Sequence, residues 1–258
     1  MVKIPKYTKN GKTYLNIACG TKMNPEWNNL DFSPYARLRK HLWIADLLKL
    51  VGLLSEVRYR KLKEIDKDII YWDVVKRGYL PFDDNTFDAV YHCHFIEHIE
   101  YNQVLNFLSE CLRILKVGGI IRIVFPDLYQ QIVYYLETYN LCTVNFSSAI
   151  DNHLRNIENL LHQLVANEST HNIDEKPVVR FLERIIRGNP KKMGWSHRWM
   201  YDKFTMQKLL SEVGFQEVQV LNAFSSNIPG FHSYCLDIDK HGIPHYSSGS
   251  LFMEAIKK

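Results

Sequence analysis

A histidine-rich segment of the chain could carry acid–base chemistry: His92-Cys-His-Phe-Ile-Glu-His98. Imidazole is the side chain whose pKa lies nearest neutrality, so histidine is the usual general base for a hydroxyl group. His94 and His98 are four residues apart and would share a face if a helix began before His94. We identify both as candidate catalytic bases, with a structural role at a helix start as the alternative for each. Glu97 is expected to brace a neighbouring loop.

A third candidate base, His197, lies within Trp195-Ser-His-Arg-Trp199. Two tryptophans, a histidine and an arginine so close together could form a stacking surface for a sugar or another planar acceptor. The alternative is a packed junction in which Trp199 and Tyr201 are buried. Both interpretations remain open at this point.

A zinc site is the other chemistry that clustered histidines and cysteines suggest. The ligand set would be His92, Cys93, His94 and His98. However, residues 92 and 94 would point to opposite faces of an extended strand, and no second cluster with finger-like spacing follows. We therefore predict no metal site.

Small residues and a carboxylate could hold a nucleoside near the start of the chain. Small residues at Ala18 and Gly20 would let a ligand approach the backbone closely, and Asp31 could accept both hydroxyls of a ribose. The glycine spacing G-x-G-x-x-G is absent after Gly20, which argues against a dinucleotide and hence a dehydrogenase. A tight turn that holds no ligand is the alternative.

Alternating strands and helices must position these residues. Helical patterns occupy residues 34–64 and 101–115, and the strands are predicted at residues 14–18, 27–32, 69–73, 87–91 and 120–125. This alternation implies an α/β fold whose mostly parallel sheet is covered on both faces. Ligands of such sheets bind beyond the carboxyl ends of the strands, where Asp31, Asp73 and Asp127 lie. For Asp127, capping of the next helix is the expected role.

The pattern changes after residue 127. Residues 128–187 are predicted to be nearly all helical, with a third helix expected to begin at Pro177 and to stop at Gly188, and the insertion is expected to span residues 128–194. A helix at 205–212 and strands at 215–221 and 250–256 follow. We therefore predict one core formed by residues 1–127 and 195–258, with a helical insertion between them.

Composition sets limits on the protein class. The chain has 258 residues, a net charge of +4 and 46% hydrophobic residues, which excludes a disordered or fibrous protein and gives no reason to expect a nucleic-acid partner. No apolar run approaches the roughly 18 residues of a membrane span. The 5 cysteines are odd in number and lack CxxC spacing, which favours reduced thiols and a cytoplasmic location.

Five motifs follow one another in the first half of the chain: Leu15-Asn-Ile-Ala-Cys-Gly20, Trp27-Asn-Asn-Leu-Asp31, Leu80-Pro-Phe-Asp-Asp-Asn-Thr-Phe-Asp88, Phe95-Ile-Glu-His98 and Leu115-Lys-Val-Gly-Gly119. Each motif is weak alone, but the series is specific. It resembles class I S-adenosylmethionine-dependent methyltransferases, in particular a bacterial branch associated with cell-surface polysaccharide pathways. Arg198-Trp-Met-Tyr-Asp202 and Val213-Gly-Phe215 are similar to the start and end of that family's last helix.

The resemblance implies a Rossmann-like fold with a seven-stranded sheet and S-adenosylmethionine as the cofactor. Carried over by position, it implies that Asp31 holds the ribose hydroxyls. The other implied cofactor-binding residues are Asn16, Ala18, Cys19 and Gly20 around the methionine end, Asp73 and Val74 at the adenine, and the backbone of His92 and Cys93 at the methionine amine. The chain departs from the family pattern at Ala18, where glycine is usual, and in the stretch from Gly20 to Trp27, which is too short for a full first helix.

The acceptor is the least determined part of the resemblance. The insertion would cap the carboxyl end of the sheet on the acceptor side, and the family association suggests O-methylation of a sugar or glycan precursor. A basic stripe could meet a phosphate on the acceptor or could be only a solvated helix face: Arg180, Arg184, Arg187, Lys191 and Lys192. Methylation of another small metabolite at nitrogen or carbon, and a non-catalytic module that binds the cofactor, remain the alternatives.

Overall fold

A single mixed sheet forms the centre of the molecule in the computed structural model, which describes residues 7–8, 10–165, 197–246 and 249–258. Its strand order is β3-β2-β1-β4-β5-β7-β6, and only β7 is antiparallel to its neighbours. The strands are β1 (Tyr14–Ile17), β2 (Asn28–Asp31), β3 (Ile70–Tyr71), β4 (Phe87–Cys93), β5 (Leu115–Pro126), β6 (Phe215–Leu221) and β7 (Ser250–Lys257). The predicted Rossmann-like, mostly parallel sheet of seven strands is confirmed.

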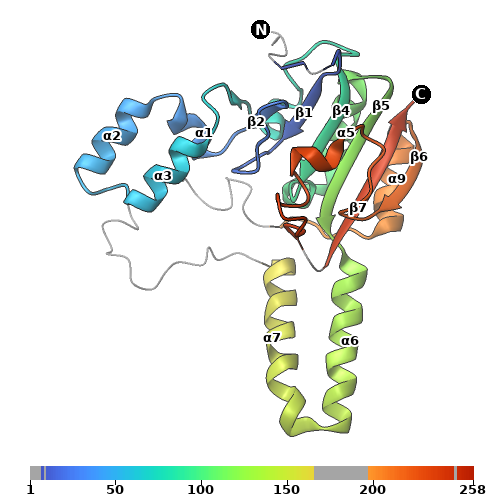
Figure 1. Cartoon of the computed structure of the whole chain (residues 1–258). Helices are drawn as coiled ribbons and strands as arrows, with labels where there is room; N and C mark the ends of the chain where they lie inside the picture. Colours follow the sequence, from blue (N-terminus) through green and yellow to red (C-terminus); the bar gives the residue numbers. More distant parts are fainter. Residues whose placement is uncertain (1–6, 9, 166–196, 247–248) are drawn as a thin grey trace.

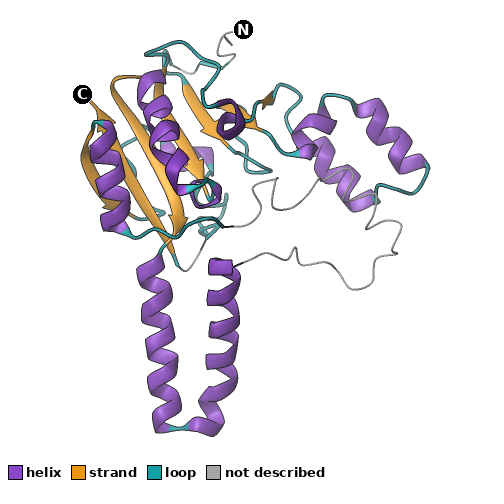
Figure 2. Ribbon diagram, turned by 180° about the vertical axis from the view of Figure 1, so that it is seen from behind, coloured by secondary structure: helices purple, strands orange, loops and turns teal. Residues whose placement is uncertain are grey.

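Helices α5 (Tyr101–Ile114) and α9 (Lys203–Val213) cover one face of this sheet, in front of the strands in Figure 2. Apolar residues of α5 recur at helical spacing, and Val104, Leu108 and Cys111 are completely buried against the sheet. The short helix α4 (Val74–Arg77) follows β3, and the 3₁₀ turn η1 (Ile96–His98) follows β4. Val74 of α4 and Ile96 of η1 are both buried in the main hydrophobic core.

The opposite face is covered in part by the long segment 222–246 that follows β6, which contains the 3₁₀ turn η3 (Phe231–Tyr234) (Figure 1). Phe231 and Tyr234 pack edge-on against Trp27, with ring centroids 6.1 and 5.6 Å away. The chain between β1 and β2 forms turns and no helix, as its length predicted. The segment after β6 therefore covers Trp27 and the neighbouring strands on this face, and the chain between β1 and β2 contributes no helix there.

A buried charge network fastens this segment to the sheet. Arg122 of β5 donates from Nε to Asp237 at 2.7 Å and from Nη1 to Glu254 at 2.7 Å. Tyr91 donates its hydroxyl to the other oxygen of Asp237, also at 2.7 Å. All four side chains are buried, so each charge depends on its partners for stabilisation.

Helices α1 (Pro34–Arg39), α2 (Leu42–Leu50) and α3 (Glu56–Glu64) form a separate unit beside β2 (Figure 1). They lie within the predicted helical stretch 34–64. Their small core includes Ala36 and Leu62, and Cys19 from the β1–β2 turn reaches into it. The unit therefore braces that turn from the outside.

The described part of the insertion is an antiparallel hairpin of α6 (Leu128–Val144) and α7 (Phe146–Val165), which projects beyond the carboxyl end of β5 (Figure 1). Asp127 caps α6 by accepting a hydrogen bond from Tyr129 N, so its expected capping role is confirmed. Thr138 and His153 bond one another in the hairpin interior at 2.9 Å. The helix predicted from Pro177 and the basic stripe at 180–192 lie outside the described residues.

Strand β5 begins earlier than predicted, at Leu115 instead of Ile120. The pairing with β4 shifts register here, and Gly118 adopts a φ of 77°. Gly119 is tightly enclosed, because a Cβ atom there would lie 2.8 Å from the carbonyl oxygen of Lys116. The glycine pair thus forms an irregularity within the strand instead of preceding it.

None of the helices in the described part of the chain has the length and apolar character that a membrane span requires.

Candidate active site

The register of the sheet brings the carboxyl ends of four strands to one edge. Ile17 of β1 pairs with Leu30 of β2 on one side and with His92 of β4 on the other. Asp31, the next residue of β2, pairs with Tyr71 of β3. The predicted cofactor residues that follow these positions therefore lie along one edge.

The turn after β1 has the open backbone expected of a ligand-binding turn. Ala18 and Gly20 both have a φ of 54°, in the left-handed region, which is unusual for alanine. A Cβ atom added at Gly20 would meet nothing within 4 Å, so the backbone there is accessible to a ligand. Gly20 N donates to Asp31 Oδ2 at 2.8 Å, which fixes the turn to the end of β2.

Asp31 is nearly buried and accepts a second hydrogen bond from Ser33 N through its other oxygen. A carboxylate has about four acceptor positions, so each oxygen keeps capacity for one further donor. Two remaining acceptor positions at the end of β2 fit a pair of ribose hydroxyls. The open turn at Gly20 and this carboxylate therefore fit S-adenosylmethionine.

Two of the predicted cofactor residues shape the turn with their side chains. Asn16 is buried, and its amide donates to the carbonyl of Lys22 at 2.8 Å. Cys19 turns its side chain into the core of the α1–α3 unit, and burial raises the pKa of its thiol well above the usual value. These two residues offer a ligand their backbone only.

Asp73 follows β3 as the helix cap of α4, because its side chain accepts from Lys76 N at 2.9 Å. Val74, the first residue of α4, is buried. Trp72 N bonds the carbonyl of Asp31 at 3.1 Å, so both predicted adenine residues lie beside the end of β2. Their contacts with adenine stay a prediction.

His92 and Cys93 end β4, and their side chains lie in different surroundings. The His92 ring is completely buried, with Phe95 and Phe107 as edge-on neighbours, and burial lowers its pKa to about 4. Burial raises the pKa of Cys93 to about 12. Since His92 belongs to the core, the ligand set considered for zinc is not brought together.

His94 lies directly beyond β4 with a φ of 48°. Its Nε2 atom is 3.0 Å from Ser250 Oγ, and its Nδ1 atom is 3.2 Å from Glu97 Oε1. Tyr246 stacks on the ring at a centroid distance of 3.9 Å. The ring is thus held on both edges and one face.

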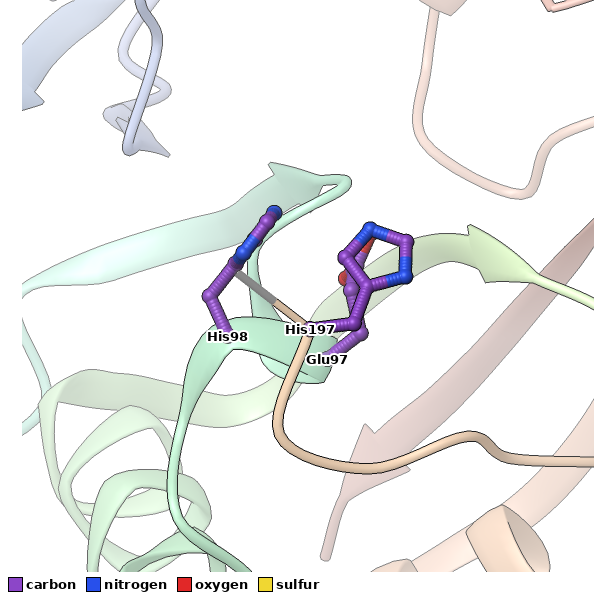
Figure 3. Close-up of side chains that lie close together, drawn as sticks. All are labelled: Glu97, His98 and His197. Atoms are coloured by element: carbon purple, nitrogen blue, oxygen red, sulfur yellow. The ribbon is translucent and has the colours of Figure 1, made fainter. Parts of the chain in front are cut away.

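Helix η1 begins at Ile96, after His94, so His94 and His98 do not share a helix face. His98 instead packs edge-on against His197, with ring centroids 4.8 Å apart (Figure 3). Glu97 lies with them, its Oε1 atom 3.9 Å from His197 Nε2. The three predicted bases therefore gather around one carboxylate.

Glu97 is completely buried, and neither of its oxygens has a well-formed hydrogen bond. Burial alone would raise its pKa, but the contact with His94 and the charges of His98 and His94 outweigh it, so the pKa is lowered. Its backbone carbonyl accepts from Arg198 N and Trp199 N, at 2.6 and 3.3 Å. Glu97 does brace a neighbouring loop, as expected.

The junction that includes His197 is only partly buried. Tyr201 is fully buried, whereas Trp199 is 47% exposed and lies against Tyr101 at a centroid distance of 4.8 Å. The expectation that both Trp199 and Tyr201 would be buried is therefore wrong for Trp199. Trp195 lies outside the described residues.

Three residues of this site were not predicted from the sequence: Lys22, Tyr246 and Ser250. The Lys22 ammonium lies 3.4 Å from the centre of the Tyr246 ring, and burial lowers its pKa. Tyr246 and Ser250 reach His94 only because the segment after β6 folds back along the sheet. A local motif could not reveal them, since the contacts join residues more than 150 positions apart.

Comparison with known proteins gives one family match and a set of remote structures. A family model described as a methyltransferase domain matches residues 54–123. A complex of the Haloferax volcanii Trm112 methyltransferase activator with its candidate methyltransferase is 13% identical, with 96% of this chain and 83% of that chain covered and a TM-score of 0.44. An Archaeoglobus fulgidus S-adenosylmethionine-dependent methyltransferase is 15% identical, with 97% and 88% covered and a TM-score of 0.41. No curated protein sequence matches the chain.

Proposed function

We propose that this chain, an S-adenosylmethionine-dependent methyltransferase, transfers its methyl group to a hydroxyl of a sugar or glycan precursor, with His94 as the general base. The enzyme class follows from the family match over residues 54–123 and from the sheet with its single reversed strand. The acceptor and the base are the proposed parts. The proposal keeps the cytoplasmic location expected from the cysteine pattern.

The residues that would hold the cofactor lie along the carboxyl edge. Asp31 would bind the ribose hydroxyls, and the backbone from Ala18 to Gly20 would enclose the methionine end. Asp73 and Val74 would meet the adenine. When bound, S-adenosylmethionine would supply a methyl group from its sulfonium sulfur, and the leaving group would be the neutral thioether.

The position of the His94 ring is the observation that carries the proposed base. The Glu97 carboxylate beside Nδ1 favours a proton on that nitrogen, so Nε2 becomes the proton acceptor. Ser250 Oγ lies 3.0 Å from Nε2, so the acceptor hydroxyl would take the place that the serine hydroxyl holds. As the acceptor oxygen forms its bond to the methyl carbon, its proton would pass to Nε2.

An aromatic pair next to the histidines supports a sugar-like acceptor. Tyr101 and Trp199 expose 46% and 47% of their surface and lie against each other, and Trp199 is two residues from His197 in the chain. Exposed aromatic faces suit the apolar face of a sugar ring. The phosphate-binding role of the basic stripe stays a prediction.

Calorimetric titration with S-adenosylmethionine and S-adenosylhomocysteine tests the cofactor site first. We expect micromolar binding, at least tenfold weaker in Asp31→Ala and unchanged in Asp83→Ala, an exposed aspartate far along the chain. Absence of binding by folded wild-type protein would overturn the assignment.

Transfer of a labelled methyl group to nucleotide sugars and glycans tests the base. We expect His94→Asn to lower kcat by about 10²–10⁴-fold with cofactor affinity retained, and the exposed His41→Asn to have no effect. Activity that survives His94→Asn would favour methylation at nitrogen or carbon. Tight cofactor binding without turnover on any acceptor would favour a non-catalytic binding module.

A further inference from the structure

We propose that Glu97, His98 and His197 bind one divalent first-row transition-metal ion. Each residue offers one ligand atom, and the three atoms lie within 4.8 Å of one another (Figure 3). Metal–ligand bonds of about 2.1 Å place neighbouring ligands roughly 3 Å apart, so small side-chain rotations would close the set around an ion. This prediction replaces the expectation of no metal site, which considered a different set of residues.

The buried carboxylate is the strongest argument for a cation. The Glu97 side chain is only 1% exposed, and neither oxygen has a well-formed hydrogen bond. Burial disfavours the charged form of a carboxylate, and the contact with His94 Nδ1 at 3.2 Å compensates it only in part, so a cation between Glu97 and the two other histidines would stabilise the site. Its neighbours are ring nitrogens, which coordinate metals readily when neutral.

The backbone holds the ligands together although they are far apart in the sequence. Helix η1 places Glu97 and His98 in succession at the end of β4. The Glu97 carbonyl accepts hydrogen bonds from Arg198 N and Trp199 N, so the segment carrying His197 is tied to the same residue. Such fixed positions reduce the entropy lost when a metal binds.

The ligand set indicates the class of metal. Two imidazoles and a carboxylate suit Zn²⁺, Fe²⁺, Co²⁺ or Mn²⁺, whereas Mg²⁺ prefers oxygen ligands. Three protein ligands leave at least one coordination position open. The His197 side chain is 15% exposed, so the ion would be reached from the side of the histidines.

The open position would take an oxygen of the acceptor, and this role rests on the proposed function. Glu97 would then ligate the metal while its Oε1 atom keeps the contact with His94 Nδ1. His94 would be oriented by the metal-bound carboxylate, as second-sphere histidines commonly are. Binding of the ion itself does not depend on the methyl acceptor.

Metal binding to the full chain can be measured without turnover. Chelator-treated protein would be titrated with Co²⁺, followed by visible absorption, and with Mn²⁺, followed by electron paramagnetic resonance. We expect one site per chain, with affinity reduced at least tenfold in Glu97→Gln and in His197→Asn. The exposed His41→Asn is the matched control and should bind as wild type does.

The outcomes separate this site from the proposed function. No Co²⁺ or Mn²⁺ binding by folded wild type at millimolar metal, or equal binding by His197→Asn, would overturn the metal site. His94→Asn should lose activity and keep the metal. If Glu97→Gln fails to fold, His197→Asn decides, because His197 lies on a partly exposed loop.

Discussion

Acid should destabilise the folded chain through the buried His92 ring. Its pKa is about 4 in the folded protein, against 6.5 for an ordinary histidine, because burial disfavours the charged imidazolium. The unfolded chain therefore binds a proton more readily. The stability associated with neutral His92 is complete above pH 6.5 and is lost as the pH falls from there toward 4.

The size of this effect follows from the shift. About 2.5 pKa units at about 1.4 kcal/mol each give roughly 3 kcal/mol, most of which is lost by pH 4.5. The substitution His92→Leu places an apolar side chain between Phe95 and Phe107 and removes the titrating imidazole. The free energy of unfolding of the variant minus that of wild type should therefore increase by about 2–3 kcal/mol when the pH falls from 7.5 to 4.5, whatever its value at pH 7.5.

Urea unfolding at the two pH values measures the difference directly. Carboxylates that titrate in the same range affect wild type and variant equally, so they cancel in the comparison. The exposed His41→Leu should show no such growth. If the gap between wild type and His92→Leu is the same at both pH values, the burial of a neutral imidazole in this core is refuted.

Three further perturbations test other parts of the structure. Arg122→Met leaves buried carboxylates without their cation and should lower the free energy of unfolding in urea by about 3–5 kcal/mol. The control Lys12→Met removes an exposed ion pair and should lower it by about 1 kcal/mol or less. Equal losses in the two variants would contradict the buried network. Gly119→Ala places a methyl group against a backbone carbonyl, so the free energy of unfolding should fall by about 1–3 kcal/mol. An unchanged Tm in thermal unfolding would argue against that contact. Iodoacetamide at pH 8 should label exposed Cys235 well before Cys93, because burial raises the Cys93 pKa to about 12. Mass spectrometry of the labelled peptides gives the order of labelling, and faster labelling of Cys93 would contradict this reasoning.

The strands and their carboxyl ends could be predicted because each depends on a short stretch of chain. Apolar runs closed by a small or acidic residue predicted the end of β1 at Ala18, one residue beyond its end at Ile17, and the end of β2 at Asp31. In a parallel sheet these ends lie together whatever the loops do. Helical spacing also predicted that the chain after residue 128 is helical, where the structure has α6 and α7.

The surroundings of the histidines could not be predicted in the same way. The partners of His94 come from residues 246 and 250, and His98 meets His197, so each contact depends on how a long connection returns to the sheet. The side chain of His92 was ambiguous too, because alternation along a strand buried on both faces does not tell which face holds a polar residue. Only the packing of Phe95 and Phe107 settles its place in the core.

The segment 222–246 has a consequence for synthesis of the protein on the ribosome. Phe231 and Tyr234, the aromatic partners of Trp27 and Tyr91, are translated at least 140 residues after them. The strands that are made first would therefore expose this aromatic surface until the segment 222–246 has emerged. Such long-range closure slows folding and invites aggregation, so chaperones that shield apolar surfaces should matter more for this chain than for one whose sheet is covered by its own first helix.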